Sequence, residues 1–521
     1  MRWILKKYNP IISDAIAQNF SLDPISAILL AQRAGEEYES WINVKHTVPN
    51  PKALPDIDQA ITTIKQAKYI GIFSDYDADG VTSAVMWQEF LCARDIKTTT
   101  YIPNRKVGYG PTQENIQELI ARGVDTLLFL DCGTDCHELF TNIKIPIVVI
   151  DHHLVKNPSL PVAAFVNPYR TNVTQFLNLC TAALSLLVIA AIDSKYPSKH
   201  LYDLAAIGTI SDIMPLHRLN RSIVKRGLEY INQGSRPVLA KLVFGNKITS
   251  QDIAFSIAPK INAAGRMEHA DHALQIFSPN ATDEHVEFLI NLNKSRQTQE
   301  AEILASLKID DSNPVIVLYD PTWNLGIVGI IAAKIKEQYN KPTFVLTKAG
   351  QYLKGSARST ECIDVGKLIQ NAVASNVIVN GGGHRCAGGI TLLPEQLENF
   401  IEFTKIVPAA KPSTYEIDAV TSVQGLRSVT AFELLEPFGN GNPAPKFFLS
   451  NITIHKYQMI KEIHARISIT DGNATITVMA FKITQKIQQF LKGKYNLDMI
   501  IEYCGGTWVM REMELANTAK S

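Results

Sequence analysis

The sequence predicts an α/β protein of several domains, in which a buried parallel sheet is followed by a second α/β unit and a β-rich module. Short continuous apolar runs alternate with helix-like segments through the first half of the chain, which is typical of parallel strands covered by helices. Acidic and histidine residues follow directly after three of these runs. After Pro408 and Pro412 the helical pattern gives way to closely spaced strand-like segments.

A chain of 521 residues is long enough for roughly three or four domains. Its 46% hydrophobic content supports substantial cores, and 51 basic against 50 acidic residues leave a formal net charge of +1. This balance is no signature of a nucleic-acid-binding protein, although a local basic groove can coexist with an acidic site. Seven cysteines without a CxxC pair predict neither a disulfide framework nor a structural zinc site.

The first residues lack the apolar core of a signal peptide, and no apolar run reaches transmembrane length. We therefore expect a cytoplasmic protein that does not contact the membrane. No coiled-coil pattern is present in the sequence, so a monomer is the default expectation.

The first half of the chain begins with a mixed helical pattern over residues 1–50, and prolines at 49, 51 and 55 then mark a connector. The strands of the parallel sheet are expected at three apolar runs, 70–73, 126–130 and 145–150, and at a short strand over 98–102. Helices are expected over residues 57–68, 81–87, 111–122, 182–191 and 201–207. A strand–helix alternation of this kind places ligands at the carboxyl ends of the strands.

A long charged segment over 283–308 has helical periodicity and is expected to join two lobes. The second α/β unit is predicted to have strands over 314–319, 342–346 and 352–359, with Ser356 and Arg358 on one face of the last strand. A glycine-rich loop, residues 380–389, follows. The β-rich module is predicted to contain strands over 447–454, 467–469, 474–481 and 497–503.

The predicted chemistry is organised around residues 74–80, Ser-Asp-Tyr-Asp-Ala-Asp-Gly. The carboxylates of Asp75, Asp77 and Asp79 stand at every second position, so in an extended segment they share one face. Crowded carboxylates repel one another unless a cation neutralises them, and oxygen-rich sites suit Mg²⁺ or Mn²⁺. A polar turn between a strand and a helix is the alternative explanation, because acidic loops are common.

Polar residues after later elements complete this set. They are Asp131, His152, His153 and Asp212. Because mixed carboxylate and imidazole ligands support paired Mn²⁺ or Mg²⁺ ions, we expect the set to hold two such ions, which together promote phosphoryl hydrolysis. Taken singly, Asp212 is better explained as a helix cap and His153 as a structural histidine.

Four stretches resemble, in order, the motifs of the DHH phosphoesterase superfamily: Asp75–Gly80, Asp131–Gly133, Asp151–His153 and Gly208–Asp212. Gly381-Gly382-Gly383-His384 resembles the signature of the associated second domain, DHHA1. Two further stretches, Lys260–Met267 and Pro437–Pro443, make the chain similar to the bacterial RecJ family of single-strand-specific 5′→3′ DNA exonucleases. The resemblance covers about residues 50–515.

The resemblance implies a catalytic set made of Asp77, Asp79, Asp131, His152, His153 and Asp212. All of these except His153 would ligate the metal ions, together with Asp75, whereas His153 would orient the site or meet the scissile phosphate. The implied substrate contacts are Arg105, Arg266, Ser356, Arg358 and His384. Arginine suits phosphate because its planar fork binds two oxygens. The plain alternatives are surface salt bridges for the arginines and a tight turn around His384.

The resemblance also implies a division into an N-terminal helical segment, a DHH domain, a connecting helix, a DHHA1 domain and an OB-fold domain. Their expected bounds are 1–50, 51–282, 283–310, 311–407 and 408–521. OB-folds bind single strands through a basic groove and aromatic stacking, for which Lys446, Phe447 and Phe448 are candidates, although one of the phenylalanines is better explained as a core residue. Some family members carry an additional C-terminal domain, which we expect to be absent here.

The implied function is a metal-dependent exonuclease that degrades single-stranded DNA and releases 5′-mononucleotides in DNA repair and recombination. A single-strand-binding protein and a helicase are the expected partners. Two alternatives stay open: a DHH phosphodiesterase of short oligonucleotides or cyclic dinucleotides, and a non-catalytic single-strand-binding scaffold. The β-rich module argues against the first and the complete ligand set against the second. Arg385-Cys386 departs from the small or apolar residues usual in the glycine-rich loop, without removing its glycines or histidine.

Overall fold

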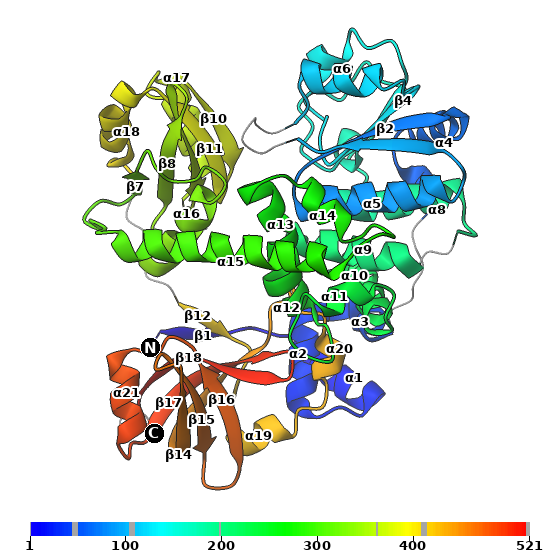
Figure 1. Ribbon diagram of the computed structural model, residues 1–521. Helices are drawn as coiled ribbons and strands as arrows, with labels where there is room; N and C mark the ends of the chain where they lie inside the picture. Colours follow the sequence, from blue (N-terminus) through cyan, green and yellow to red (C-terminus); the bar gives the residue numbers. More distant parts are fainter. Residues whose placement is uncertain are drawn as a thin grey trace.

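The computed structural model describes residues 2–43, 50–103, 110–196, 199–360, 363–407 and 414–516. Figure 1 shows two α/β lobes beside each other, with the long helix α15 (Asp283–Ser306) running beneath both, and a β-rich module below that helix. None of the described helices combines the length and the apolar character that crossing a membrane requires.

The first lobe contains a five-stranded parallel sheet in the order β3-β2-β4-β5-β6. Its strands are β2 (Tyr69–Ser74), β3 (Lys97–Tyr101), β4 (Thr126–Leu130), β5 (Ile147–Ile150) and β6 (Ala164–Val166). Alternate residues enter different cores: Ile72 and Leu128 pack on one face, and Phe73 and Phe129 pack on the other. Because both faces are covered, the inner strands β2, β4 and β5 are almost continuously apolar, as the sequence predicted, whereas the edge strand β3 is polar and only partly buried.

Helices on the first face bring the later motifs to the sheet. They include α4 (Ile57–Gln66), α5 (Ala78–Cys92), α8 (Thr181–Ile192), α9 (Lys199–Ser211), α10 (Arg218–Asn232) and α13 (Ala258–Met267). The other face packs against a core that includes α6 (Gln113–Ala121) and α7 (His137–Phe140). Helix α8 is apolar all round because it lies inside the lobe, where almost every residue is buried.

The second lobe has a mixed sheet in the order β10-β11-β9-β8-β7, in which only β7 and β8 are parallel. The strands are β7 (Ile316–Tyr319), β8 (Thr343–Ala349), β9 (Tyr352–Arg358), β10 (Asn380–His384) and β11 (Ala387–Leu392). Helices α16 (Val328–Tyr339), α17 (Val365–Ala374) and α18 (Leu397–Thr404) accompany them. The expectation of a glycine-rich loop is therefore wrong, since the segment forms a hairpin whose backbone completes the ladder next to β9.

The C-terminal module is a barrel in the order β13-β14-β15-β16-β18-β17, closed by pairing of β14 with β17. Its strands are β13 (Ala419–Thr421), β14 (Lys446–Ile460), β15 (His464–Thr470), β16 (Thr475–Ala480), β17 (Leu497–Cys504) and β18 (Thr507–Leu515). Short helices α19 (Val423–Arg427), α20 (Phe432–Leu435) and α21 (Gln485–Lys492) complete it. Phe447 is fully buried in the core, the role expected for one of the two phenylalanines, and Phe448 is also buried and packs on Trp3, so neither is free to stack on a base.

The N-terminal residues share the core of this barrel. Helices α1 (Pro10–Phe20), α2 (Pro24–Ala34) and α3 (Tyr38–Ile42) contribute apolar side chains to the same cluster as the barrel strands. Strand β1 (Trp3–Leu5) pairs in parallel with β12 (Tyr415–Ile417). The Gln32 amide donates a hydrogen bond to the Asp418 carbonyl at 2.9 Å, and Arg33 pairs with the Asp418 carboxylate at 3.0 Å. The two ends of the described chain therefore fold together.

Candidate metal centre

The first acidic motif turns the end of β2 into the start of α5. The Asp77 carboxylate accepts hydrogen bonds from the N–H groups of Asp79 and Gly80 at 3.0 and 3.1 Å, which makes Asp77 the N-cap of the helix. A Cβ on Gly80 would lie 2.3 Å from the Asp75 carbonyl oxygen, so the turn requires glycine. Asp79 therefore lies in the first helical turn, and the expectation of three acids alternating along an extended segment is wrong.

Asp79 is held by the N-terminus of α8. Its carboxylate accepts hydrogen bonds from the N–H groups of Thr181 and Ala182 at 2.7 and 2.9 Å, where a helix favours negative charge. Thr181 Oγ1 also donates to Asp131 Oδ1 at 3.1 Å. Burial raises the pKa of Asp79, and the neighbouring His152 and these hydrogen bonds only partly offset it. One helix end thus orients carboxylates from two motifs.

Asp131 and His152 follow adjacent strands and meet at the carboxyl edge of the sheet. His152 Nε2 lies 3.3 Å from Asp131 Oδ1 and 3.4 Å from Asp212 Oδ2. Burial, followed by the charges of nearby aspartates, raises the pKa of Asp131 well above its usual value. Burial lowers the pKa of His152, which favours the neutral imidazole that ligates metals.

Asp151 orients both histidines, a role that the sequence did not reveal. Its Oδ1 accepts hydrogen bonds from the backbone N–H groups of His152 and His153, and lies 2.7 Å from His153 Nδ1. Its Oδ2 accepts from the Thr134 hydroxyl at 2.6 Å. Burial alone would raise the pKa of Asp151, but the hydrogen bond and the charge of His153 hold it well below its usual range. Burial likewise opposes protonation of His153, yet Asp151 raises its pKa to about 9.

Asp212 follows α9 and closes the cluster. Its Oδ2 is buried and accepts no hydrogen bond from the described residues. Burial, then repulsion by Asp79 and Asp77, raises its pKa to about 8. Gly208, one turn earlier, permits the approach, because a Cβ there would lie 2.6 Å from Asp79 Oδ1.

Seven predicted side chains thus come together in three overlapping groups, each with ligand atoms within 4.8 Å of one another. The groups are Asp75, Asp77 and Asp131; Asp79, His152 and Asp212; and Asp131, His152 and His153. Carboxylates that repel one another, a neutral imidazole and an orphaned buried oxygen fit a divalent cation that prefers oxygen and nitrogen ligands. The donor set suits Mn²⁺ or Mg²⁺.

Helix α13 braces the first motif and reaches the second lobe. Asn262 Oδ1 accepts a hydrogen bond from Ala78 N–H at 2.8 Å, at the first residue of α5. Arg266 Nη1 donates to the Gly326 carbonyl at 3.0 Å, and a Cβ on Gly326 would lie 2.2 Å from the Arg266 carbonyl oxygen. Arg266 therefore lies where the lobes meet. The position of Asn262 within the 260–267 stretch was the only sequence signal for its role.

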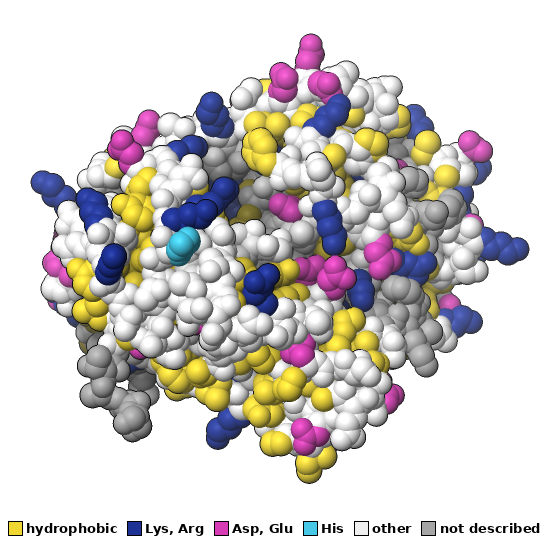
Figure 2. Space-filling view, turned by 90° about the horizontal axis from the view of Figure 1, so that it is seen from below, with side chains coloured by type: hydrophobic (Ala, Val, Ile, Leu, Met, Phe, Trp, Pro, Cys, Tyr) yellow, Lys and Arg dark blue, Asp and Glu magenta, His cyan; other side chains and the backbone are white. Residues whose placement is uncertain are grey.

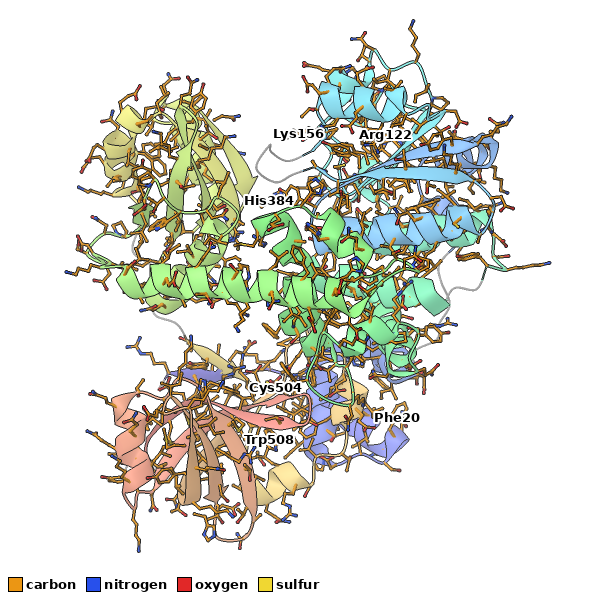
Figure 3. All side chains as sticks on the ribbon, in the orientation of Figure 1. Phe20, Arg122, Lys156, His384, Cys504 and Trp508 are labelled. Atoms are coloured by element: carbon orange, nitrogen blue, oxygen red, sulfur yellow. The ribbon has the colours of Figure 1, made fainter. Side chains whose placement is uncertain are left out.

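Three other predicted substrate contacts lie in the second lobe. Ser356 and Arg358 share the face of β9 next to α16, because a Cβ on Gly329 would lie 3.2 Å from Ser356 Oγ and 3.3 Å from Arg358 Nη2. Register places Arg358, Ala387 and the exposed His384 in one cross-strand row. Figure 3 shows His384 on the side of this lobe that faces the first lobe. Arg105 lies outside the described residues.

Figure 2 shows a hollow near the middle of one face, with an acidic side chain inside it and with Lys or Arg side chains and a histidine beside it. An acidic floor with basic edges can hold cations and an anionic substrate at the same time. The surface therefore has the charge arrangement that phosphoryl chemistry needs.

Comparison with known proteins identifies three parts of the chain. Residues 69–209 match the DHH family, N-terminal domain; residues 312–406 match the DHHA1 domain; and residues 417–512 match the RecJ OB domain. Fold and site thus define a DHH-type α/β protein with a second lobe and an OB barrel.

Two curated relatives carry the name single-stranded-DNA-specific exonuclease RecJ. The Bacillus subtilis protein is 29% identical over 92% of this chain and 66% of its own length. The Thermus thermophilus protein is 32% identical over 74% of this chain and 60% of its own length. The chain thus spans slightly less than two thirds of the length of these relatives.

Two solved structures extend the comparison. Thermus thermophilus RecJ in complex with Mn²⁺ superimposes with a TM-score of 0.82 at 24% identity, covering 99% of this chain and 80% of that one. An exonuclease RecJ bound to manganese has a TM-score of 0.59 at 30% identity, covering 68% of this chain and 96% of that one. The chain belongs to the RecJ family.

Proposed function

We propose that this protein is a metal-dependent exonuclease that degrades single-stranded DNA from the 5′ end and releases 5′-mononucleotides. The observation that carries the proposal is the carboxylate and imidazole cluster at the carboxyl edge of the first sheet, which includes the buried Asp212 Oδ2 that accepts no hydrogen bond from the described residues. Membership of a family whose named relatives are single-stranded-DNA-specific exonucleases supports it.

Six side chains would hold two Mn²⁺ or Mg²⁺ ions: Asp75, Asp77, Asp79, Asp131, His152 and Asp212. When bound, such a pair lowers the pKa of water and stabilises the leaving oxygen of a phosphodiester. The solved relatives named for Mn²⁺ and Mg²⁺ complexes support this choice of ions. The residues themselves supply a fixed geometry, because helix ends and backbone N–H groups hold Asp77 and Asp79 in place.

His153 would act on the substrate. Because Asp151 raises its pKa to about 9, the imidazole carries a proton at neutral pH and can donate it in a hydrogen bond to a phosphate oxygen. The Asp151 contact to Nδ1 leaves Nε2 as the donor toward the substrate.

The phosphate backbone would lie between the lobes. Arg266, Ser356, Arg358 and His384 would supply hydrogen-bond donors to it, and Arg105 is a further candidate. A groove of this kind would admit a single strand and exclude the wider duplex. The barrel would bind the strand further on through exposed groups such as Phe481, which packs edge-on against His464.

We propose that the chain is divided into an N-terminal helical segment over 1–50, a DHH domain over 51–282, a connecting helix over 283–310, a DHHA1 domain over 311–407 and an OB-fold domain over 408–521. We also propose that the protein acts as a monomer in the cytoplasm, in DNA repair and recombination. A single-strand-binding protein and a helicase would supply its substrate.

The test is degradation of 5′-labelled single-stranded and duplex DNA of one sequence, with Mn²⁺ and with a chelator. We expect mononucleotides from the single strand alone, only with Mn²⁺, and none from the Asp131→Ala variant. Equal degradation of both substrates, or undiminished activity of the variant, would contradict the proposal. Preference for a dinucleotide over a long strand would favour a short-substrate phosphodiesterase, and binding without cleavage would favour a scaffold.

A further inference from the structure

A loop of the C-terminal module contacts the chain next to the candidate metal centre. This loop, residues 436–443, joins α20 to the segment before β14 and includes the Pro437–Pro443 stretch. It packs against residues 213–221 of the first lobe, which begin directly after Asp212 and run into α10. We call residues 436–443 the Asn440 loop.

Asn440 holds the first lobe at two points. Its side-chain Nδ2 donates a hydrogen bond to the Ile213 carbonyl at 2.6 Å, and its own carbonyl accepts one from Leu216 N–H at 2.7 Å. The two bonds span the segment that follows Asp212. A single residue of the C-terminal module thus fixes both ends of this segment.

The glycines beside Asn440 make this approach possible. A Cβ on Gly439 would lie 2.7 Å from Leu216 Cδ1, and one on Gly441 would lie 2.7 Å from His217 Nε2. Gly441 has a φ of +74°, as the tight turn between Gly439 and Asn442 requires. The Gly-Asn-Gly sequence is therefore explained by contact with the first lobe.

The rest of the loop is fixed as firmly. The fully buried Asn442 donates through Nδ2 to the carbonyls of Leu435 and Pro437, each at 2.8 Å. From the first lobe, Arg221 Nη1 donates to the Leu435 carbonyl at 3.0 Å, and Ser250 Oγ donates to the Phe438 carbonyl at 2.7 Å. The loop presents Asn440 from a rigid support.

The residue that Asn440 contacts, Ile213, has an unfavourable backbone conformation. Its φ is +56°, in the left-handed region that β-branched residues avoid, and its side chain is 69% exposed, so burial does not compensate. Asp212 directly precedes it, with Oδ2 at 3.4 Å from His152 Nε2. The backbone conformation that directly follows the metal-centre residue Asp212 is thus one that the local sequence disfavours.

We propose that Asn440 is a positioning residue for Asp212, through which the C-terminal module completes the metal centre of the first lobe. This inference rests on the proposed function, because it takes Asp212 as a metal ligand. Coupling of this kind is reciprocal, so cation binding also tightens the attachment of the loop.

The first experiment measures Mn²⁺ affinity of the full chain by the electron paramagnetic resonance signal of free Mn²⁺. Removing a group that orients a ligand costs roughly 10–100-fold in metal affinity, so Asn440→Ala should raise the Kd for Mn²⁺ about 10-fold. On a single-stranded oligonucleotide, kcat should fall while KM stays unchanged. The matched control is Asn473→Ala, at an exposed asparagine of the same module, which should leave both measurements at the wild-type value.

The second experiment separates positioning from loss of folding. Asparagine tolerates the left-handed region, so Ile213→Asn added to Asn440→Ala should recover a large part of the Mn²⁺ affinity. Hydrogen exchange at residues 436–443 should slow when Mn²⁺ binds the wild type. Wild-type affinity of Asn440→Ala, or no recovery in the double variant, would overturn the inference and leave the exonuclease proposal standing. Mn²⁺ binding that survives Asp131→Ala would instead overturn the proposed function on which it rests.

Discussion

Buried carboxylates face one another in the candidate metal centre, and their protons should report cation binding. Burial and the neighbouring aspartates raise the pKa of Asp212 to about 8 and raise that of Asp131 well above its usual value. At neutral pH the cation-free site therefore holds protons that a cation must displace. Because the folded pKa of these carboxyls lies above the unfolded pKa, the cation-free protein is most stable at low pH with respect to these groups. The free energy of unfolding falls as the pH rises from the unfolded pKa through the folded pKa.

We predict that the affinity for Mn²⁺ rises with pH up to about 8 and levels off above it. Titration calorimetry in two buffers with different ionisation enthalpies should show proton release at pH 7. The Asp212→Asn variant should release fewer protons. Equal heats in both buffers would contradict the prediction.

At single residues, the sequence predicted which side chains meet at the carboxyl edge of the sheet, because several of them directly follow apolar runs that are clearly strands. Asp131 and His152 are examples. The supporting groups could not be predicted, since Asp151, Thr181 and Asn262 act through contacts that only the tertiary fold creates. Asp79 lies beside the residues expected, but the first turn of helix α5 places it there and not the alternation of an extended segment.

Between elements, Gly208 of α9 allows three helices to converge on the site. A Cβ there would lie 2.6 Å from both Ala182 Cβ and Asp79 Oδ1. We predict that Gly208→Ala destabilises the first lobe by about 1–3 kcal/mol, as overpacking does. Because Asp79 must move, Mn²⁺ affinity should fall as well. Denaturant unfolding and Mn²⁺ titration measure the two effects, and a variant with unchanged Mn²⁺ affinity would refute the second.

A buried ion network also ties the helices of the first lobe. Arg236 pairs with Glu89 of α5 at 2.8 Å and with the fully buried Asp203 of α9 at 3.1 Å. Removing one partner of a buried pair costs about 3–5 kcal/mol, so Arg236→Ala should lower the free energy of unfolding by that order. The control is Arg122, labelled in Figure 3, whose exposed pair with Glu118 should contribute less than about 0.5 kcal/mol. Similar losses for Arg236→Ala and Arg122→Ala would contradict this ranking.

At the level of elements, strands β2, β4 and β5 of the first lobe could be predicted because they are buried on both faces, whereas β6 was not expected. The glycine-rich segment of the second lobe could not be predicted, because residues 380–389 carry few side chains whose pattern reveals a strand. These residues form a hairpin whose strand β11 pairs with β9, and this pairing depends on the tertiary fold.

Across the whole molecule, α2 is part of the barrel core. Leu30 of α2 is fully buried in that cluster, whereas Ile11 of α1 is 79% exposed. Leu30→Ala should cost about 2–5 kcal/mol, and Ile11→Ala should be close to neutral. Hydrogen exchange should accelerate in β14 and β17 of Leu30→Ala, with β2 and β4 unaffected. Acceleration confined to α1 and α2 would show that the helices and the barrel do not share a core.

This arrangement could not be predicted, since the amphipathic pattern of residues 10–34 indicates which face is apolar but not what covers that face. The partner lies at the far end of the described chain. Pairings over such separations depend on tertiary packing, which local periodicity does not contain.

The closure of the two chain ends has a consequence for synthesis. The Asp23 carboxylate accepts a hydrogen bond from Thr430, 407 residues further along the chain. At about 5–20 residues per second, roughly 20–80 seconds separate the appearance of these two residues from the ribosome. During that interval the apolar face of α2 has no partner, while the first lobe can already fold. A nascent chain of this protein therefore exposes an apolar helix face ahead of a finished domain, and such a surface promotes aggregation until the barrel has been synthesised.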